Sequence, residues 1–178
     1  MNYYKKIIYI PKVDKNDNLI GKIERWEAHE KNILHRGFTT IIKVNKYYIL
    51  QLRKHIIFDN LFDLSFSSHP IFKNNQLEDI KKTIIDTLKR EWVIDEENFK
   101  IDFIKKYHYQ EKDEKSNMFE NEINYLFLLN LNKLPKINPE FSYKMIPLTK
   151  EELIKNFSKY NFVPWIKNID LNELKNIL

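Results

Sequence analysis

The stretch Leu77–Trp92, LEDIKKTIIDTLKREW, decides the fold class of this chain. Its apolar residues recur at intervals of three and four, which places them on one face of a helix. These residues are Leu77, Ile80, Ile84, Ile85, Leu88 and Trp92. We therefore predict a helix over this stretch, with its apolar face packed against a β-sheet.

The residues before this helix form β-rich runs joined by turn signals. Ile7–Val13 and Leu19–Ile23 flank the polar segment Asp14–Asn18, which predicts a hairpin. Thr39–Val44 and Tyr47–Leu52 are separated only by Asn45 and Lys46. Because Asn tolerates positive φ, we predict a second hairpin with a two-residue loop at this point.

The residues after the helix repeat this order of strands and then a helix. Phe99–Tyr109 and Glu122–Leu131 are predicted strands, and Thr149–Phe157 is a predicted helix that begins with a capping pattern of Thr149 with Glu152. The order of strands, helix, strands, helix predicts a mixed α/β or α+β fold.

Length and composition limit the kind of protein. With 178 residues, 43% hydrophobic and 31% charged, the chain has the composition of a folded protein and the length of one domain, residues 1–178. The formal charge of +5 comes from dispersed lysines, which favours anionic ligands only weakly, and the lysines form no basic stripe, so we expect no nucleic-acid partner. Without cysteine, signal peptide or membrane span, the expected location is cytoplasmic. We expect a monomer or a homodimer.

Histidines and carboxylates form a candidate metal site. The chain has five histidines, and His29, His35 and His69 lie in suggestive positions. Glu120 and Glu122 occupy alternate positions of an incoming strand, so both can project to the same side. Imidazoles and carboxylates together suit a divalent cation such as Mn²⁺, Zn²⁺ or Mg²⁺. Taken alone, surface histidines and solvated carboxylates would explain the same pattern.

Five short motifs span residues 13 to about 168 of the chain. They are Val13-Asp14 with Leu19-Ile20-Gly21, Glu27-Ala28-His29 with His35-Arg36-Gly37-Phe38, Ser67-Ser68-His69-Pro70, Glu120-Asn121-Glu122-Ile123-Asn124-Tyr125, and Val163-Pro164-Trp165. In order and approximate spacing they resemble the type I isopentenyl-diphosphate isomerases, a branch of the Nudix superfamily. The resemblance implies a Nudix fold, with mixed β-sheets sandwiched by helices. It also implies the isomerisation of isopentenyl diphosphate in isoprenoid biosynthesis.

The resemblance further implies a set of functional residues. Glu122 would deliver a proton with Tyr109 beside it, and such an acid must be protonated near neutral pH, which requires burial. Trp165 would stabilise a carbocation with its ring face. Glu91 would bind a Mg²⁺ ion that accompanies the diphosphate. The implied ligands of the family's metal, Mg²⁺ or Mn²⁺ with Zn²⁺ as a further candidate, are His29, His35, His69, Glu120 and Glu122.

The chain departs from the family pattern at two places. Ser67 stands where the family has the Cys that exchanges the second proton, and an alcohol is several pKa units less acidic than a thiol. Thr87 stands where the family offers an Arg to the diphosphate. Arg25, Arg53 and Lys54 are the remaining candidates for binding the prenyl diphosphate, although solvated surface charge would explain them equally well.

Two other functions stay open. A Nudix pyrophosphohydrolase needs several carboxylates on one helix to hold metal ions, and the aligned positions here keep Glu91 alone out of four. A non-catalytic descendant that binds a metal ion or a diphosphate would explain the loss of the Cys. The retained His and Glu ligands argue against that reading.

Overall fold

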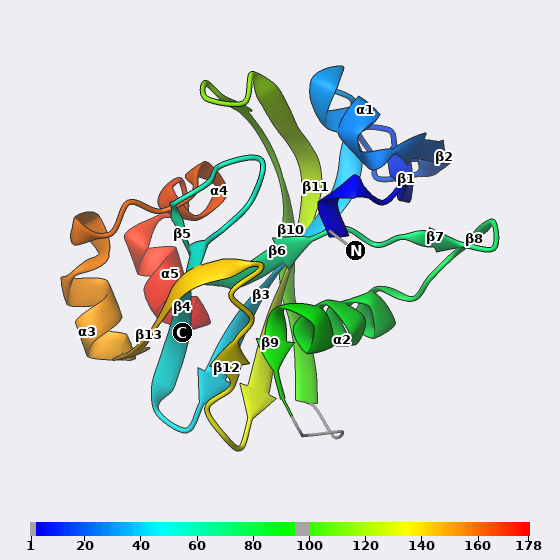
Figure 1. Ribbon diagram of the computed structural model, residues 1–178. Coiled ribbons are helices and arrows are strands. Elements are labelled where there is room, and N and C mark those ends of the chain that lie inside the picture. The colour runs from blue at the N-terminus through cyan, green and yellow to red at the C-terminus, as the bar shows by residue number, and fades with distance from the viewer. Residues whose placement is uncertain (1–2, 95–99) are drawn as a thin grey trace.

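The computed structural model describes residues 3–94 and 100–178, and its strands make up most of the ordered structure (Figure 1). The strands are β1 (Tyr9–Val13), β2 (Leu19–Glu24), β3 (His35–Val44), β4 (Tyr47–Arg53), β5 (Phe62–Asp63), β6 (Ser65–Ser68), β7 (Phe72–Lys73), β8 (Gln76–Leu77), β9 (Trp92–Val93), β10 (Lys100–Asp113), β11 (Met118–Leu131), β12 (Lys136–Ile137) and β13 (Ser142–Thr149).

The helices are short apart from one. α2 has 12 residues, and no helix of the described residues is long and apolar enough to cross a membrane. The helices are η1 (Tyr3–Lys5), α1 (Arg25–Glu30), α2 (Ile80–Glu91), α3 (Lys150–Lys155), η2 (Phe157–Lys159), α4 (Pro164–Lys167) and α5 (Leu171–Ile177), where η marks a 3-10 turn.

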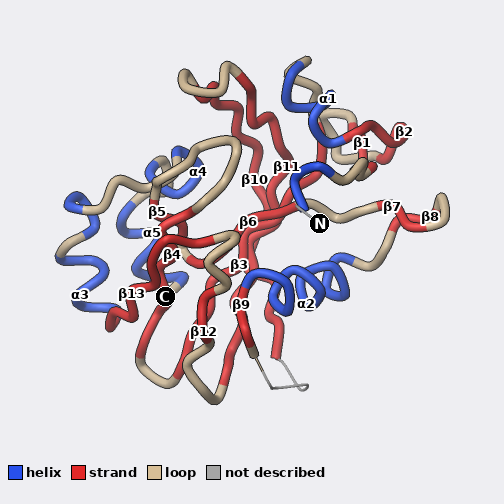
Figure 2. The backbone as a smooth tube through the Cα atoms, in the orientation of Figure 1, coloured by secondary structure: helices blue, strands red, loops and turns tan. Residues whose placement is uncertain are grey.

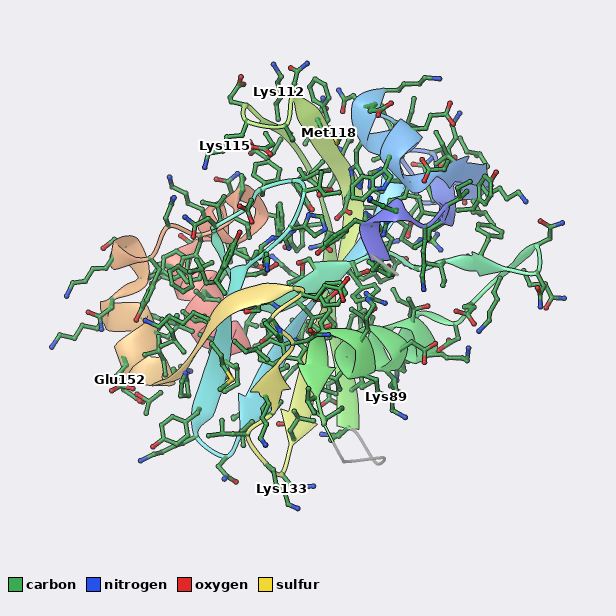
Figure 3. All side chains as sticks on the ribbon, in the orientation of Figure 1. Lys89, Lys112, Lys115, Met118, Lys133 and Glu152 are labelled. Atoms are coloured by element: carbon green, nitrogen blue, oxygen red, sulfur yellow. The ribbon has the colours of Figure 1, made fainter. Side chains whose placement is uncertain are left out.

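One mixed sheet of nine strands organises the described residues. β3 lies at its centre and pairs antiparallel with β1, β4 and β6 and parallel with β11. The sheet continues from β11 to β10, from β1 to β2, and from β4 to β5 and β13. β10 and β11 run side by side over most of their length (Figure 2) and end in a hairpin that carries Lys112 and Met118 (Figure 3).

Hydrophobic cores lie on both faces of this sheet, because neighbouring residues of a strand point to opposite sides. Ile41 of β3 and Leu126 of β11 pack with α3, α4 and α5, whereas Ile42 and Phe127 pack with α2. Figure 1 shows α2 on one side of the sheet and α3 to α5 on the other. The expected sheet sandwiched by helices is therefore confirmed.

The helix predicted over Leu77–Trp92 is present, but it spans only Ile80–Glu91. α2 begins at Ile80, because the Asp79 side chain accepts hydrogen bonds from two backbone N–H groups of the first turn and caps the helix. Leu77 belongs instead to the small β7–β8 hairpin. Trp92 ends the helix and starts β9, yet it is fully buried and continues the packed face of Ile84 and Leu88.

The predicted hairpins and the capping box are confirmed. β1 pairs with β2, and Asn45, at φ 54°, makes the loop between β3 and β4. Thr149 and Glu152 cap α3 reciprocally. Pairing of β10 with β11 continues to Asp113, opposite Met118, so only residues 114–117 form the connecting turn. The strand predicted to start at Phe99 begins outside the described residues.

Candidate metal site and adjoining cavity

Strand pairing brings the candidate ligands together from distant parts of the chain. The parallel pairing of β11 with β3 sets Glu122 beside His35. β6 pairs with β3 through Ser68 and Phe38, so His69 leaves the sheet next to the same end of β3. His29 is supplied by α1, which packs against β11. Three imidazoles and two carboxylates therefore meet at the N-terminal end of the central strand β3.

Donor atoms of four of these residues lie within 4.8 Å of one another, namely His29, His35, His69 and Glu120. The three imidazole centroids are 4.9 to 5.1 Å apart. Ligands about 2.1 Å from a divalent ion are separated by up to roughly 4.2 Å, so small side-chain adjustments bring this set into coordination distance.

Hydrogen bonds orient two of the histidines for coordination. A backbone carbonyl only accepts hydrogen bonds, so His29 Nδ1 donates to Phe119 O at 2.8 Å and His35 Nδ1 donates to Ile33 O at 2.7 Å. The proton on Nδ1 leaves Nε2 with its lone pair available. Metal-binding histidines in proteins are held by this kind of bond.

The fifth candidate, Glu122, lies among the imidazoles. Its Oε1 is 2.9 Å from His69 Nε2 and 3.4 Å from His35 Nε2, and its Oε2 accepts a hydrogen bond of 2.7 Å from the Tyr109 hydroxyl. Gly37 makes room for this carboxylate, since a Cβ there would overlap both Glu122 oxygens. The Glu122 side chain thus packs directly against the backbone of β3 at Gly37.

The two carboxylates of the site have opposite pKa shifts. Burial raises the pKa of Glu120 well above its usual range, and the neighbouring Glu122 charge adds to the rise. Burial also favours a higher pKa for Glu122, but contacts with His35 and His69 outweigh it and hold the pKa far below its usual range. Contacts with two imidazoles therefore favour the ionised form of Glu122, whereas an acid that delivers a proton has to be protonated. The proton-donor role of Glu122 stays a prediction.

The donor set fits a divalent metal ion. Among the described residues, His35 Nε2, His69 Nε2 and Glu120 Oε2 are buried without a hydrogen bond of normal geometry, despite the close approach of Glu122 to both histidines. Burial, followed by the neighbouring histidines, lowers the pKa of His29 well below its usual value, which keeps that imidazole neutral and able to coordinate. Burying such nitrogen and oxygen atoms without a partner costs free energy, and a bound ion would remove that cost.

Ser67 forms a hydrogen-bonding centre beside the metal ligands. Its hydroxyl donates to Asp63 Oδ2 at 2.8 Å, accepts from Trp165 Nε1 at 3.2 Å and lies 2.9 Å from the Thr39 hydroxyl. Asp63 is fully buried and also accepts a hydrogen bond of 3.0 Å from Arg53 Nη1. Ser67 therefore links the wall of the cavity to a buried ion pair.

A small cavity adjoins the ligands and collects most of the predicted site residues. Its free space is about 20 Å³, room for one ion or water molecule. Trp165 stacks on Tyr109 with ring centroids 5.4 Å apart, and the Arg53 guanidinium carbon lies over the Trp165 ring, 5.2 Å from its centroid. The predicted site residues that line this cavity are Arg25, His29, Arg53, Ser67, His69, Glu91, Tyr109, Glu120, Glu122 and Trp165.

Two predicted residues take other positions. Glu91 lines the cavity but pairs with Arg90 at 3.1 Å, and it is not one of the clustered metal-binding donors. Lys54 is exposed, outside the cavity lining, and donates to the Pro139 carbonyl at 3.0 Å. The structure therefore does not bring Lys54 to the predicted diphosphate-binding residues.

The scarcity of arginine and glycine could have pointed to site residues that the sequence patterns missed. The chain has 4 Arg against 26 Lys and only 2 Gly. One of the two glycines is Gly37, beneath Glu122, and Arg90 is one of the four arginines. Asp63, next to Ser67, carried no comparable signal.

Comparison with known proteins places the fold in a recognised class. The crystal structure of DR0079 from Deinococcus radiodurans aligns with a TM-score of 0.65 at 15% identity, over 95% of this chain and 98% of that one. A Nudix-family hydrolase from Clostridium perfringens aligns with a TM-score of 0.52 at 13% identity, over 81% and 98%. The sequence matches no protein-family model and none of the curated proteins.

These likenesses concern the fold, and the narrower resemblance to the isomerases stays a prediction. The arrangement of a mixed sheet between α2 and the C-terminal helices, shared over nearly the whole chain, is the Nudix fold.

Proposed function

We propose that this protein is a metal-dependent enzyme that acts on a small-molecule diphosphate. The observation that carries the proposal is the convergence of three imidazoles, two of them oriented by backbone carbonyls, and two carboxylates beside the cavity that Arg25 and Arg53 line. A divalent ion held by such a set would supply electrophilic stabilisation of charge on phosphate oxygens. Guanidinium groups recognise the same oxygens through paired hydrogen bonds.

The residues of the chain have separate tasks in this proposal. Arg25 and Arg53 bind and orient the diphosphate. Trp165 and Tyr109 form an aromatic wall that excludes water from the reacting end of the substrate. Ser67 fixes the edge of that wall through its hydrogen bond with Trp165.

Hydrolysis of the diphosphate is the first candidate reaction. It is supported by the fold likeness to a Nudix-family hydrolase. On α2, however, Glu91 is the one glutamate left of the four that Nudix hydrolases use to hold metal ions, and it pairs with Arg90. Hydrolysis by this chain would therefore rely on the carboxylates of β11, Glu120 and Glu122.

Isomerisation of a prenyl diphosphate is the second candidate reaction. The specific observation in its favour is the hydrogen bond from Tyr109 to Glu122 next to the stacked ring of Trp165, which together offer a proton path and a π face for a carbocation. Ser67 disfavours it, because a hydroxyl is a poor proton acceptor at neutral pH.

Metal analysis tests the shared part of the proposal. Protein dialysed against Mn²⁺ or Mg²⁺ is expected to retain about one ion per chain, and His35→Ala is expected to lose it. His108→Gln is the matched control, since His108 is exposed on β10 and pairs with Asn121 outside the cluster. Equal metal content in the wild type and His35→Ala would contradict the proposed site.

A product assay distinguishes the reactions. The metal-loaded protein is incubated with isopentenyl diphosphate in deuterated water, and separately with a panel of nucleoside diphosphate esters. Deuterium in a C5 diphosphate product supports isomerisation, and released phosphate or monophosphate supports hydrolysis. Binding with neither outcome would contradict an enzymatic role.

A further inference from the structure

Arginine is concentrated around the cavity. Three of the four arginines in a chain with 26 lysines, Arg25, Arg53 and Arg90, approach one another there. Each has a buried Nε without a hydrogen-bond partner among the described residues, whereas Arg36 uses its Nε to bind Asp17. Arg25 and Arg53 are only 4% and 5% exposed. Buried guanidinium donors without partners indicate a site for an anion.

The N-terminal turn η1 covers this site. Arg25 Nη2 reaches the carbonyl oxygens of Tyr3 and Tyr4 at 3.5 Å each, and Trp26 Nε1 donates to Tyr4 O at 2.8 Å. In Figure 1 the η1 turn, drawn in dark blue, lies between α1 and α2. Two carbonyl oxygens of the chain thus face donors that would otherwise be available to phosphate oxygens.

Arg90 holds the same turn from the other side. Its guanidinium carbon lies 3.9 Å from the centre of the Tyr3 ring, and that of Arg25 lies 4.8 Å from the same centre. Arg90 Nη2 contacts Thr87 Oγ1 at 3.2 Å and Glu91 Oε1 at 3.1 Å. Arg90 therefore extends toward the cavity along the last turn of α2, with Tyr3 stacked on it.

The cavity is too small for a diphosphate while the turn is in place. About 20 Å³ holds one water molecule, and the nine heavy atoms of a diphosphate need several times that volume. Among the contacts of η1 are one direct hydrogen bond from Trp26, one from the Tyr4 hydroxyl to Lys54 O, two long ones from Arg25 and the stacking of the Tyr3 ring on Arg90. A ligand with several charge-assisted hydrogen bonds can displace contacts of this strength.

We propose that the turn Tyr3–Lys5 is an internal competitor for the anion subsite, and that Arg90 exchanges the Tyr3 ring for a phosphate oxygen when a diphosphate displaces the turn. This inference rests on the proposed function, because it assigns the same cavity a diphosphate ligand. It adds a gate made by the chain itself and a third arginine that binds the ligand.

Binding of inorganic pyrophosphate tests the competition, measured by calorimetry without added metal so that metal-bridged binding does not contribute. The double variant Tyr3→Ala/Tyr4→Ala removes the two rings that hold the η1 turn in the cavity. It is expected to lower the dissociation constant for pyrophosphate roughly tenfold, because the turn covers the anion subsite in a smaller fraction of the molecules. Tyr9→Ala, on the exposed side of β1, is the matched control and is expected to leave it unchanged. Unchanged or weaker binding by the double variant overturns the inference and leaves the proposed function standing.

Arg90 is tested in the background that lacks the competitor. There, Arg90→Gln is expected to weaken pyrophosphate binding roughly tenfold, while Lys89→Gln, at the neighbouring exposed position of α2 (Figure 3), has no effect. Equal binding by the Arg90→Gln and Lys89→Gln proteins overturns the role of Arg90. Failure of all variants to bind pyrophosphate in this titration, while the separate dialysis assay shows that they bind metal, overturns the inference together with the diphosphate part of the proposed function.

Hydrogen exchange gives a second measurement that needs no variant. The backbone N–H of Lys6 donates to Tyr3 O in the closed turn. Saturating pyrophosphate is expected to speed amide exchange in the wild-type N-terminal segment while slowing it near Arg53. Unchanged or slower exchange in the N-terminal segment overturns displacement of the turn.

Discussion

Gly37 lies directly against the Glu122 carboxylate, on the neighbouring strand of the sheet. A methyl group at Gly37 would overlap both oxygens of Glu122, and β3 and β11 are paired in parallel at this point. The position of the carboxylate among the histidines thus depends on the absence of one side chain. This relationship can be tested directly.

Gly37→Ala is expected to push Glu122 away from His35 and His69 and to lower Mn²⁺ affinity by about 10- to 100-fold, the size of effect seen when groups that orient metal ligands are lost. The measurement is metal titration by calorimetry. A double-mutant cycle with Glu122→Ala provides the control, because Gly37→Ala should have little further effect once the carboxylate is gone. Full additivity of the two changes would rule out this coupling.

Ser67→Ala is expected to lower the free energy of unfolding by about 1–3 kcal/mol, since it leaves the Trp165 N–H and one Asp63 oxygen with a lost partner in buried surroundings. Chemical denaturation measures the change. Ser158→Ala, on the exposed turn η2, is the control and should stay within about 0.5 kcal/mol of the wild type. A loss no larger than that of the control would show that Ser67 has no part in the buried network.

The lowered pKa of Asp17 predicts that the free energy of unfolding decreases at acid pH. Burial favours a raised pKa for Asp17, but hydrogen bonds from Tyr125, Lys106 and Arg36 outweigh it and lower the pKa below its usual range. A lowered folded-state pKa stabilises the protein above the unfolded-state pKa of about 3.9, and this stabilisation disappears as the pH falls through the lower folded-state value.

The matching variant is Asp17→Asn. It should reduce the free energy of unfolding at pH 7 by about 1–3 kcal/mol, and the difference from the wild type should shrink as the pH falls below about 4. Asp102→Asn, at a partly exposed position of β10 paired with Lys100, is the control. A difference that stays constant between pH 7 and pH 2.5 would contradict the assigned cause.

Metal removal is expected to destabilise the wild type but not a variant that lacks a metal ligand. A bound ion adds RT ln(1 + [L]/Kd) to the free energy of unfolding, so Mn²⁺ at about 100 times its Kd adds roughly 2.7 kcal/mol. Thermal melting with and without a chelator measures this shift. His69→Gln should abolish the shift and His108→Gln should retain it; equal shifts in both would place the ion elsewhere.

Much of the fold followed from local patterns. The 3.6-residue apolar period located α2, the Asn45-Lys46 pair located a hairpin, and the Thr149 capping box located α3. The end points were less predictable. Leu77 continues the helical pattern but pairs in β8, because the Asp79 cap starts the helix after it.

The candidate site was predictable in composition but not in detail. The resemblance named the histidines and glutamates that do converge, and it named Tyr109, which contacts Glu122. It did not reveal that His35 and His69 both contact Glu122 and lower its pKa, because those contacts depend on how the strands pair. The contact of Arg90 with the Tyr3 ring was not predicted, because it joins segments almost 90 residues apart in the chain.

The sequence by itself determined the elements, the donor types and the scarcity of arginine and glycine, because periodicity, capping and side-chain chemistry are properties of short stretches. The tertiary structure alone decided which of these groups meet. The parallel pairing of β11 with β3 and the return of Tyr3 onto Arg25 and Arg90 are contacts between remote segments, set by long-range hydrogen bonding and packing. Distances, shifted pKa values and the closed state of the cavity all follow from those contacts.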